Sequence, residues 1–134
     1  MSYIATVTLV VPDYDDAIAY YTAVCGFVVH ADRLLDAHKR WVVIGPADGR
    51  GCQLLLAKAS TPAQGAHIGN QTGGRVAFFL HSDNFAHDYA RMRQLGVEFT
   101  EAPRQEAYGS VVKWRDRYGN MWDLLGATDV SASM

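Results

Sequence analysis

The segment VPDYDDAIAYYTAVCGF, residues 11–27, contains the end of a strand, a whole helix and the start of a second strand. Residues 3–11 are apolar and β-branched, which predicts a strand that Pro12 ends. Asp13 is a favoured helix N-cap, and Gly26 is a favoured helix end. Between them, apolar residues recur at spacings of three and four and predict a helix: Ala17, Ile18, Tyr21, Val24 and Cys25.

The same order of elements occurs twice along the chain. Three strands are predicted after the first helix, over residues 27–31, 41–45 and 52–57. Residues 58–73 are rich in Ser, Thr, Pro, Gly, Asn and Gln and predict a linker. A strand over 76–80, a helix from Asp83 to Gly96 and strands over 97–100, 110–114 and 121–125 then follow. Each half therefore has the order β-α-β-β-β.

The two halves match at a shift of seventy residues, and the matches fall on cap and turn positions. Asp13 matches Asp83, Gly26 matches Gly96 and Gly49 matches Gly119. Scattered leucines match by chance, whereas ordered cap and turn residues indicate a duplication. We therefore predict an α+β fold, in which two tandem β-α-β-β-β modules form a cup-shaped mixed sheet. Such a concave surface is where ligands usually bind.

Length and composition indicate a single domain, residues 1–134, with module 1 at about 3–57 and module 2 at about 74–127. The net charge is −2 and no basic run occurs, so nucleic acid is not an expected partner. The first residues are expected to form a strand and not a signal peptide or a membrane span. Cys25 and Cys52 have no C-x-x-C spacing and are expected to be reduced thiols. We expect a cytoplasmic protein.

Three segments together resemble the vicinal oxygen chelate superfamily, which includes glyoxalase I, fosfomycin-resistance proteins, extradiol dioxygenases and bleomycin-resistance proteins. They are VPDYDDAIAYYTAVCGF (11–27), RMRQLGVEF (91–99) and DRYGNMWDL (116–124). The resemblance covers most of the chain and implies paired modules that form a cup, often within a homodimer. It names no reaction, because this fold supports several unrelated chemistries.

The resemblance also implies where a metal would bind in metal-dependent members. The four positions are Thr6, Gln53, Ala77 and Asp123, with Arg75 as an alternative third position. Thr and Ala do not suit a divalent ion, Arg would repel it, and Gln is a weak donor, which leaves Asp123 as the only anionic ligand. The five histidines show no recognised ligand spacing. We therefore expect neither a metal nor another cofactor.

The same positions are candidates for ligand binding. Asp123 could orient a ligand, act as an acid or base, or be held by an arginine for structure alone. Arg75 could anchor an anionic group. Trp41 and Tyr108 could stack on a flat ligand. The candidate ligand-binding residues are Thr6, Trp41, Gln53, Arg75, Ala77, Tyr108 and Asp123.

Three functions remain open from the sequence. The leading hypothesis is a metal-free protein, similar to bleomycin-resistance proteins, that holds an amphiphilic or aromatic small molecule. The alternative is a glyoxalase-type lyase or isomerase, or a dioxygenase, which either uses a metal or uses Asp123 as acid or base. The metal-free enzyme would need a second catalytic group, for which Arg75, Tyr108 and Glu106 are the candidates. The third is a scaffold for protein association. Metal content and ligand turnover discriminate among them.

Overall fold

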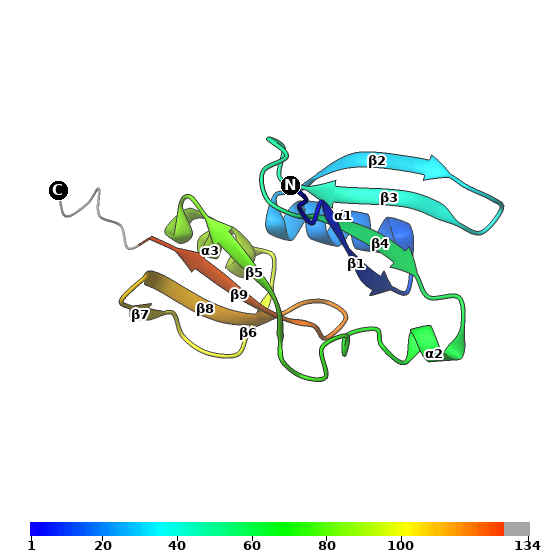
Figure 1. Ribbon diagram of the computed structural model, residues 1–134. Coiled ribbons are helices and arrows are strands. Elements are labelled where there is room, and N and C mark those ends of the chain that lie inside the picture. Colours follow the sequence, from blue (N-terminus) through cyan, green and yellow to red (C-terminus); the bar gives the residue numbers. More distant parts are fainter. Residues whose placement is uncertain (128–134) are drawn as a thin grey trace. The chain divides into compact units, whose positions relative to one another are not determined.

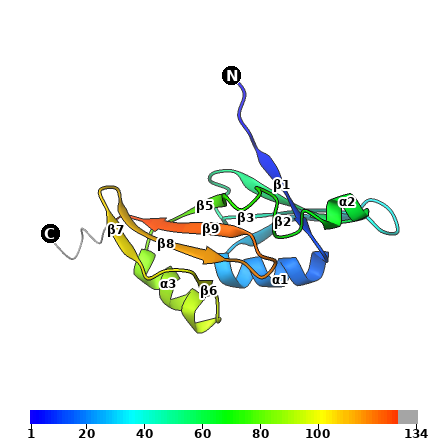
Figure 2. The same ribbon diagram turned by 90° about the horizontal axis from the view of Figure 1, so that it is seen from below.

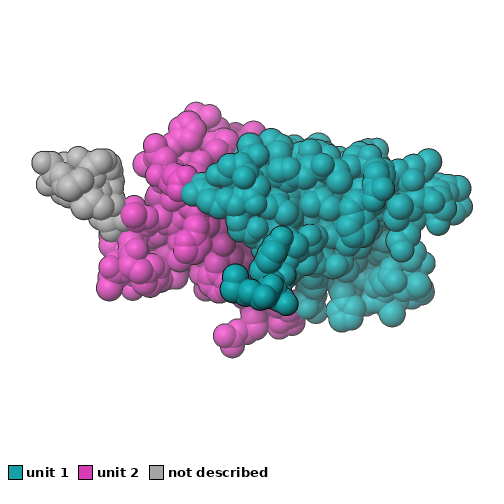
Figure 3. Space-filling model, turned by 45° about the horizontal axis from the view of Figure 1, so that its top comes forward, with its two compact units in different colours: residues 1–71 teal, residues 72–134 magenta. Residues whose placement is uncertain are grey.

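The computed structural model describes residues 1–127, which divide into two compact units. Unit 1 comprises Met1–Gln71 and unit 2 begins at Thr72 (Figure 3). The boundary falls inside the stretch that the sequence predicts as a linker. No helix among the described residues is long and apolar enough to cross a membrane.

Unit 1 contains a four-stranded mixed sheet in the order β1-β4-β3-β2. Strand β1 is parallel to β4, whereas β4 with β3 and β3 with β2 are antiparallel. Helix α1 packs on one face of this sheet (Figures 1 and 2). The elements are β1 (Thr6–Val11), α1 (Tyr14–Cys25), β2 (Val28–Leu34), β3 (Arg40–Gly45), β4 (Gln53–Lys58) and the short helix α2 (Pro62–Gly65).

Unit 2 repeats this topology. The strands β5, β9, β8 and β6 follow one another in the sheet, β5 is parallel to β9, and the other pairs are antiparallel. Strand β7 also pairs with β8. The elements are β5 (Val76–Ser82), α3 (Phe85–Gln94), β6 (Glu98–Phe99), β7 (Arg104–Glu106), β8 (Gly109–Arg115) and β9 (Met121–Gly126). The predicted α+β fold with two tandem modules is confirmed.

The first helix begins and ends as its sequence predicts. The Asp13 carboxylate accepts a hydrogen bond from the Asp16 amide at 2.8 Å, which satisfies one of the free donors of the first turn. Gly26 follows the helix with a φ of 71°, in the left-handed region that favours glycine. The buried residues share one face of the helix: Tyr14, Ala17, Tyr21 and Val24.

Helix α3, the second helix that the sequence predicts, starts one residue later than expected. Its N-cap is Asn84, whose side-chain oxygen accepts from the His87 amide at 3.1 Å, and not Asp83. Both residues are good caps, so composition alone does not choose between them. Ser82 helps to fix the choice, because its hydroxyl accepts from the Asn84 amide at 3.0 Å and donates to Asp88 at 2.5 Å.

The cores follow the two-residue alternation of the strands. In unit 1 the fully buried strand residues are Leu9, Val11, Val42, Ile44 and Leu56. In unit 2, Trp114 and Trp122 lie opposite each other on β8 and β9, and their rings stack with centroids 4.8 Å apart. The parity of Trp122 relative to Asp123 predicts that it packs on the helix side of the sheet. The structure buries both tryptophans.

The loop from β8 to β9 is organised by one buried carboxylate. Asp116 Oδ1 accepts from the backbone amides of Tyr118, Gly119 and Asn120 at 2.9–3.0 Å. Its Oδ2 atom accepts from Asn120 Nδ2 at 3.1 Å and from Trp122 Nε1 at 2.9 Å. The segment 116–124, which contributes to the family resemblance, therefore has a structural role: it fixes the register of β8 against β9.

The Gln71 side chain forms hydrogen bonds with backbone groups at the outer edge of β1. The Gln71 carboxamide accepts from the Val10 amide at 2.9 Å and donates to the Thr8 carbonyl at 2.6 Å. Strand β1 is the last strand of its sheet, so this edge would otherwise leave those two backbone groups without a strand partner. Gln71 thus binds the edge as the backbone of a neighbouring strand would.

Several boundaries differ from the sequence prediction. Residues 3–5 precede β1, and β2 continues to Leu34 around a bulge between Val29 and Ala31. Strand β6 is only two residues long, and its neighbour β7 was not predicted. Helix α2 lies inside the predicted linker, where Thr61 caps it by accepting from the Gln64 amide at 3.1 Å. Short elements such as these depend on tertiary contacts more than on local pattern.

Candidate functional site

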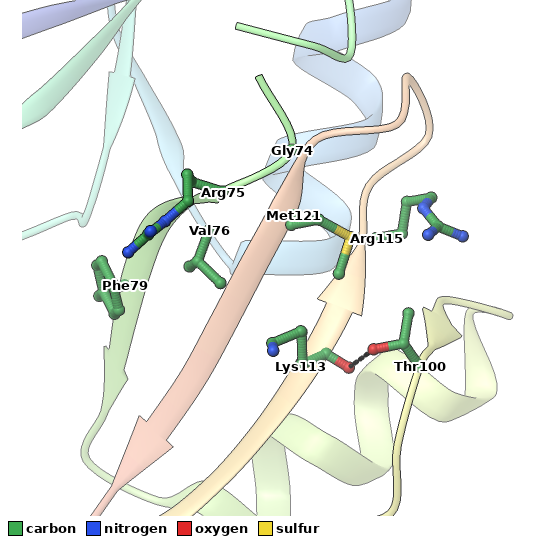
Figure 4. Close-up of a pocket in the computed structure, with 8 residues that line it drawn as sticks. All are labelled: Gly74, Arg75, Val76, Phe79, Thr100, Lys113, Arg115 and Met121. Carbon is green, nitrogen blue, oxygen red and sulfur yellow. Dashed lines mark hydrogen bonds between the residues drawn. The ribbon is translucent and has the colours of Figure 1, made fainter. Parts of the chain in front are cut away.

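A pocket of about 580 Å³ lies on the sheet of unit 2. Strands β5, β9 and β8 supply most of its lining, and Figure 4 shows the side chains together on one face. The lining combines cationic and apolar groups: Gly74, Arg75, Val76, Phe79, Thr100, Lys113, Arg115 and Met121. It therefore suits a molecule that has both an apolar part and an anionic part.

Strand alternation explains which residues face this pocket. Trp114 and Trp122 are buried, so their neighbours in sequence point to the opposite face of the sheet. Lys113 pairs with Asp123, and Arg115 pairs with Met121, in the antiparallel ladder of β8 and β9. The tight Asp116 loop sets this register and thereby the positions of these side chains.

A β-bulge sets the register of β5. The pairing of β5 with β9 shifts between Val76 and Phe78, so Phe79 lies opposite Asp123 in the parallel ladder. Phe79 is 61% exposed, which is unusual for so large an apolar residue. Ala77 belongs to the irregular part of the strand. The residue beside Asp123 on β5 is therefore an aromatic one.

The cations of the pocket differ in their partners. Arg115 forms an ion pair with Glu98 on the adjacent strand β6. Arg75 and Lys113 have no carboxylate at ion-pair distance within residues 1–127. The backbone of Lys113 is held in place, since its amide donates to Glu101 Oε2 at 3.1 Å and its carbonyl accepts from the Thr100 amide at 3.1 Å. Two positive charges thus remain available to a ligand.

Asp123 is a half-buried carboxylate between Phe79 and Lys113. Its Oδ1 atom is buried and has no hydrogen-bond partner among the described residues. Burial raises the pKa of Asp123, the charges of Lys113 and Arg104 act in the opposite direction, and Glu101 raises it further. The group is therefore easier to protonate than an exposed aspartate and can donate or accept a proton.

Three other candidates lie in unit 1. Thr6 on β1 pairs with Gln53 on β4, and strand parity places Trp41 of β3 on the same face. The Gln53 amide nitrogen donates to the Gly49 carbonyl at 3.0 Å, while its Oε1 atom is buried with no partner in the described chain. Gly45 leaves the space for this oxygen, because a Cβ at that position would lie 1.6 Å from it. Trp41 is 38% exposed.

The candidates from the sequence therefore form two groups. Thr6, Gln53 and Trp41 share a sheet face in unit 1. Arg75 and Asp123 share one in unit 2, where Ala77 lies on β5. Tyr108 lies in the turn between β7 and β8 and is 62% exposed.

Arg75 is the one lining residue that was also a candidate from the sequence. The lining residues that were not chosen are Gly74, Val76, Phe79, Thr100, Lys113, Arg115 and Met121. Lys113 and Met121 could have been found from the Asp116 loop, because a tight turn fixes which residues of β8 and β9 lie opposite each other. Phe79 lies within the strand that the sequence predicts over residues 76–80. Its place beside Asp123 depends on the bulge in β5, for which the sequence gives no signal.

The side chains at the four inferred metal positions do not make a suitable set for a divalent ion. They offer one hydroxyl, one amide and one carboxylate, and that carboxylate lies beside Lys113. Divalent ions in proteins require several anionic or imidazole donors. Among residues 1–127, no three His, Cys, Asp or Glu side chains are grouped so that they could hold a metal.

Comparison with known proteins agrees with this architecture. The sequence profile of the Glyoxalase/Bleomycin resistance protein/Dioxygenase superfamily matches residues 3–124, and the chain belongs to that superfamily. An uncharacterized protein from Shewanella frigidimarina (strain NCIMB 400) is 46% identical over 127 residues, which cover 94% of both chains.

Two solved structures have the same fold. The crystal structure of UcmS2 is 29% identical with a TM-score of 0.78, and the match covers 93% of this chain and 98% of that one. TnmS3, an antibiotic binding protein from Streptomyces sp. CB03234, is 24% identical with a TM-score of 0.75. That match covers 96% of this chain and 98% of TnmS3, and at this identity it shows the fold alone.

Proposed function

We propose that this protein binds an amphiphilic or aromatic small molecule on the pocket face of unit 2, without a metal ion. The observation that carries the proposal is the pocket itself, in which the exposed ring of Phe79 lies beside apolar and cationic side chains. An aromatic ring held on a rigid sheet offers a large apolar contact at a low cost in conformational entropy.

Two further points support a binding function. The donor set at the inferred metal positions is poor, so a Lewis-acid reaction has no evident ligand shell in this chain. TnmS3 has the same fold and is an antibiotic binding protein, which shows that the scaffold is used for binding in at least one case. The proposal includes a cytoplasmic homodimer, as expected from the sequence.

Metal stoichiometry and ligand binding test the proposal together. Protein purified without chelator, and again after dialysis against nickel, zinc, manganese or iron, is analysed for metal content. We expect almost no bound metal, and a rise in melting temperature with amphiphilic aromatic compounds in a thermal-shift screen. One metal per chain, lost in Asp123→Ala, would refute the metal-free proposal.

One observation favours a second function, an enzyme that uses Asp123 as acid or base. The carboxylate has a raised pKa and an unpartnered buried oxygen, both of which are typical of proton-transfer groups. Incubation of each compound found in the screen, followed by mass spectrometry, discriminates the two functions. Unchanged compound supports binding alone, whereas conversion that stops in Asp123→Asn supports the enzyme.

A further inference from the structure

Arg75 and Lys113 both line the pocket, and neither forms an ion pair with a carboxylate of residues 1–127. By contrast, Arg40, Arg50, Arg91, Arg104 and Arg115 form ion pairs with carboxylates. Arg75 and Lys113 form none within the described residues, although Glu101 and Asp123 are close to Lys113 in the sheet. Their charges are therefore not neutralised by an ion pair of the protein itself.

The sheet sets the distance between these two cations. Arg75 immediately precedes β5, Lys113 is on β8, and β9 runs between those strands. Two strand spacings separate β5 from β8 by about 10 Å. Lys113 and Phe79 both pair with Asp123, so Lys113 is also offset along the strands from Arg75. In Figure 4 the ammonium of Lys113 extends toward β9, whereas the Arg115 guanidinium lies on the far side of Met121 from Arg75. The Arg75 guanidinium extends toward Phe79 in the same view. Both cations line one pocket, and their long side chains can both reach a small anionic group bound in it.

The chemistry of the two side chains selects that group. The planar guanidinium of Arg75 can donate two parallel hydrogen bonds to a carboxylate, sulfonate or phosphate-type group. Lys113 supplies a compact charge that can rotate toward the remaining oxygen. Burial favours the neutral form of the neighbouring Asp123, which lowers its repulsion of an anion.

We propose that Arg75 and Lys113 form an anion-binding subsite, so that the ligand of this protein is an aromatic or apolar molecule with one acidic group. Phe79 contacts the apolar part of that molecule, and the two cations hold its oxygens. This inference rests on the proposed binding function and narrows it to one class of ligand.

A matched pair of fluorescent probes tests the subsite. Anilinonaphthalene sulfonate and phenylnaphthylamine share the same aromatic frame, and only the first carries an anionic group. We expect wild-type protein to bind the sulfonate roughly tenfold more tightly than the neutral probe, since a charge-assisted contact contributes a free energy of that order. Arg75→Gln and Lys113→Gln should each remove most of this preference, because they should weaken the sulfonate much more than the neutral probe.

Two controls make the result specific. Arg50→Gln removes the same charge from an exposed ion pair with Asp48 in unit 1 and should leave both affinities unchanged. Phe79→Ala should weaken both probes alike, which places them in this pocket. Denaturation midpoints of all variants should equal that of wild type, because Arg75, Lys113 and Phe79 belong to the sheet surface and not to the core.

The possible results separate the two proposals. Equal binding of the two probes, or sulfonate binding that survives both Arg75→Gln and Lys113→Gln, would overturn the anion subsite and leave the binding function standing. Failure of both probes to bind, or binding that is indifferent to Phe79→Ala, would overturn the binding function at this pocket and the subsite with it.

Discussion

Removal of the Asp116 side chain should destabilise unit 2 more than any loss of surface charge. This buried carboxylate accepts five hydrogen bonds, three from backbone amides and two from the side chains of Asn120 and Trp122. In Asp116→Ala these donors lose their acceptor while they remain buried or half-buried. In Asp116→Asn, one oxygen can still accept the three backbone bonds, but an amide group then faces two donors.

The expected magnitude follows from the number of donors affected. A hydrogen bond to a charged group contributes about 1.5–3 kcal/mol, but the contributions are not additive because a loosened loop admits water. We therefore expect Asp116→Ala to lower the free energy of unfolding of unit 2 by about 4 kcal/mol, and Asp116→Asn by about 2 kcal/mol. The total free energy of unfolding of a protein is about 5–15 kcal/mol, so Asp116→Ala should remove a large part of it.

Urea denaturation followed by tryptophan fluorescence measures this effect in unit 2 alone. In a Trp41→Phe background the remaining tryptophans, Trp114 and Trp122, both lie in unit 2. The control is Asp36→Ala, followed by circular dichroism, because Asp36 accepts from two turn amides at 2.7–2.8 Å but is exposed. This change should cost less than about 1 kcal/mol.

The reasoning would be refuted if Asp116→Ala lowered the unfolding free energy by less than about 1 kcal/mol, equal to an exposed turn residue. An equal loss in Asp116→Ala and Asp116→Asn would contradict the assignment of the backbone bonds to one oxygen and the side-chain bonds to the other.

Three further predictions follow from the geometry. Gly109→Ala should lower the free energy of unfolding by about 3 kcal/mol, since Gly109 has a φ of 134° and a Cβ there would lie 2.2 Å from the Gly126 carbonyl oxygen. Gly49 also has a positive φ, 74°, but has open space around it. Gly49→Ala is therefore the control and should cost about 1 kcal/mol in the same denaturation assay. The stability of Asp123→Asn relative to wild type should increase as the pH rises above 3.8, the ordinary pKa of an aspartate. The raised pKa means that the folded wild type binds more protons than the unfolded chain, so its stability falls as pH rises through this window; a constant difference between about pH 4 and about pH 7 would contradict this. Gln71→Ala should speed hydrogen exchange of the Val10 amide by about tenfold or more, as measured by NMR, and unchanged exchange would show that the edge is protected by something else.

The sequence predicts the repeated modules well because their signals are local. The cap at Asp13 and the glycine stops at positions 26 and 96 each act within one turn of a helix, and both glycines have φ values above 70°. Alternation within strands also places Trp122 and Asp123 on opposite faces correctly. These features depend only on neighbours in sequence.

The candidate site is less predictable because it depends on pairing between strands. The bulge between Val76 and Phe78 shifts β5, so Phe79 and not Ala77 pairs with Asp123. No residue type at this point demands a bulge, since it contains no glycine. Lys113 faces the pocket because it pairs with Asp123. That pairing follows from the loop around Asp116, and the sequence alone does not show that Asp116 is the buried acceptor of that loop.

The Gln71 side chain has a practical consequence for work on the isolated modules. A fragment of unit 1 that ends at Lys58 would contain every strand of its sheet but would lack the carboxamide that binds Thr8 and Val10. Its first strand would then present unpaired backbone groups, which recruit other chains into fibrils or mispaired dimers. Thirteen further residues, through Gln71, supply that missing partner. A fragment of unit 1 that is meant to stay monomeric should therefore end after Gln71 and not after β4.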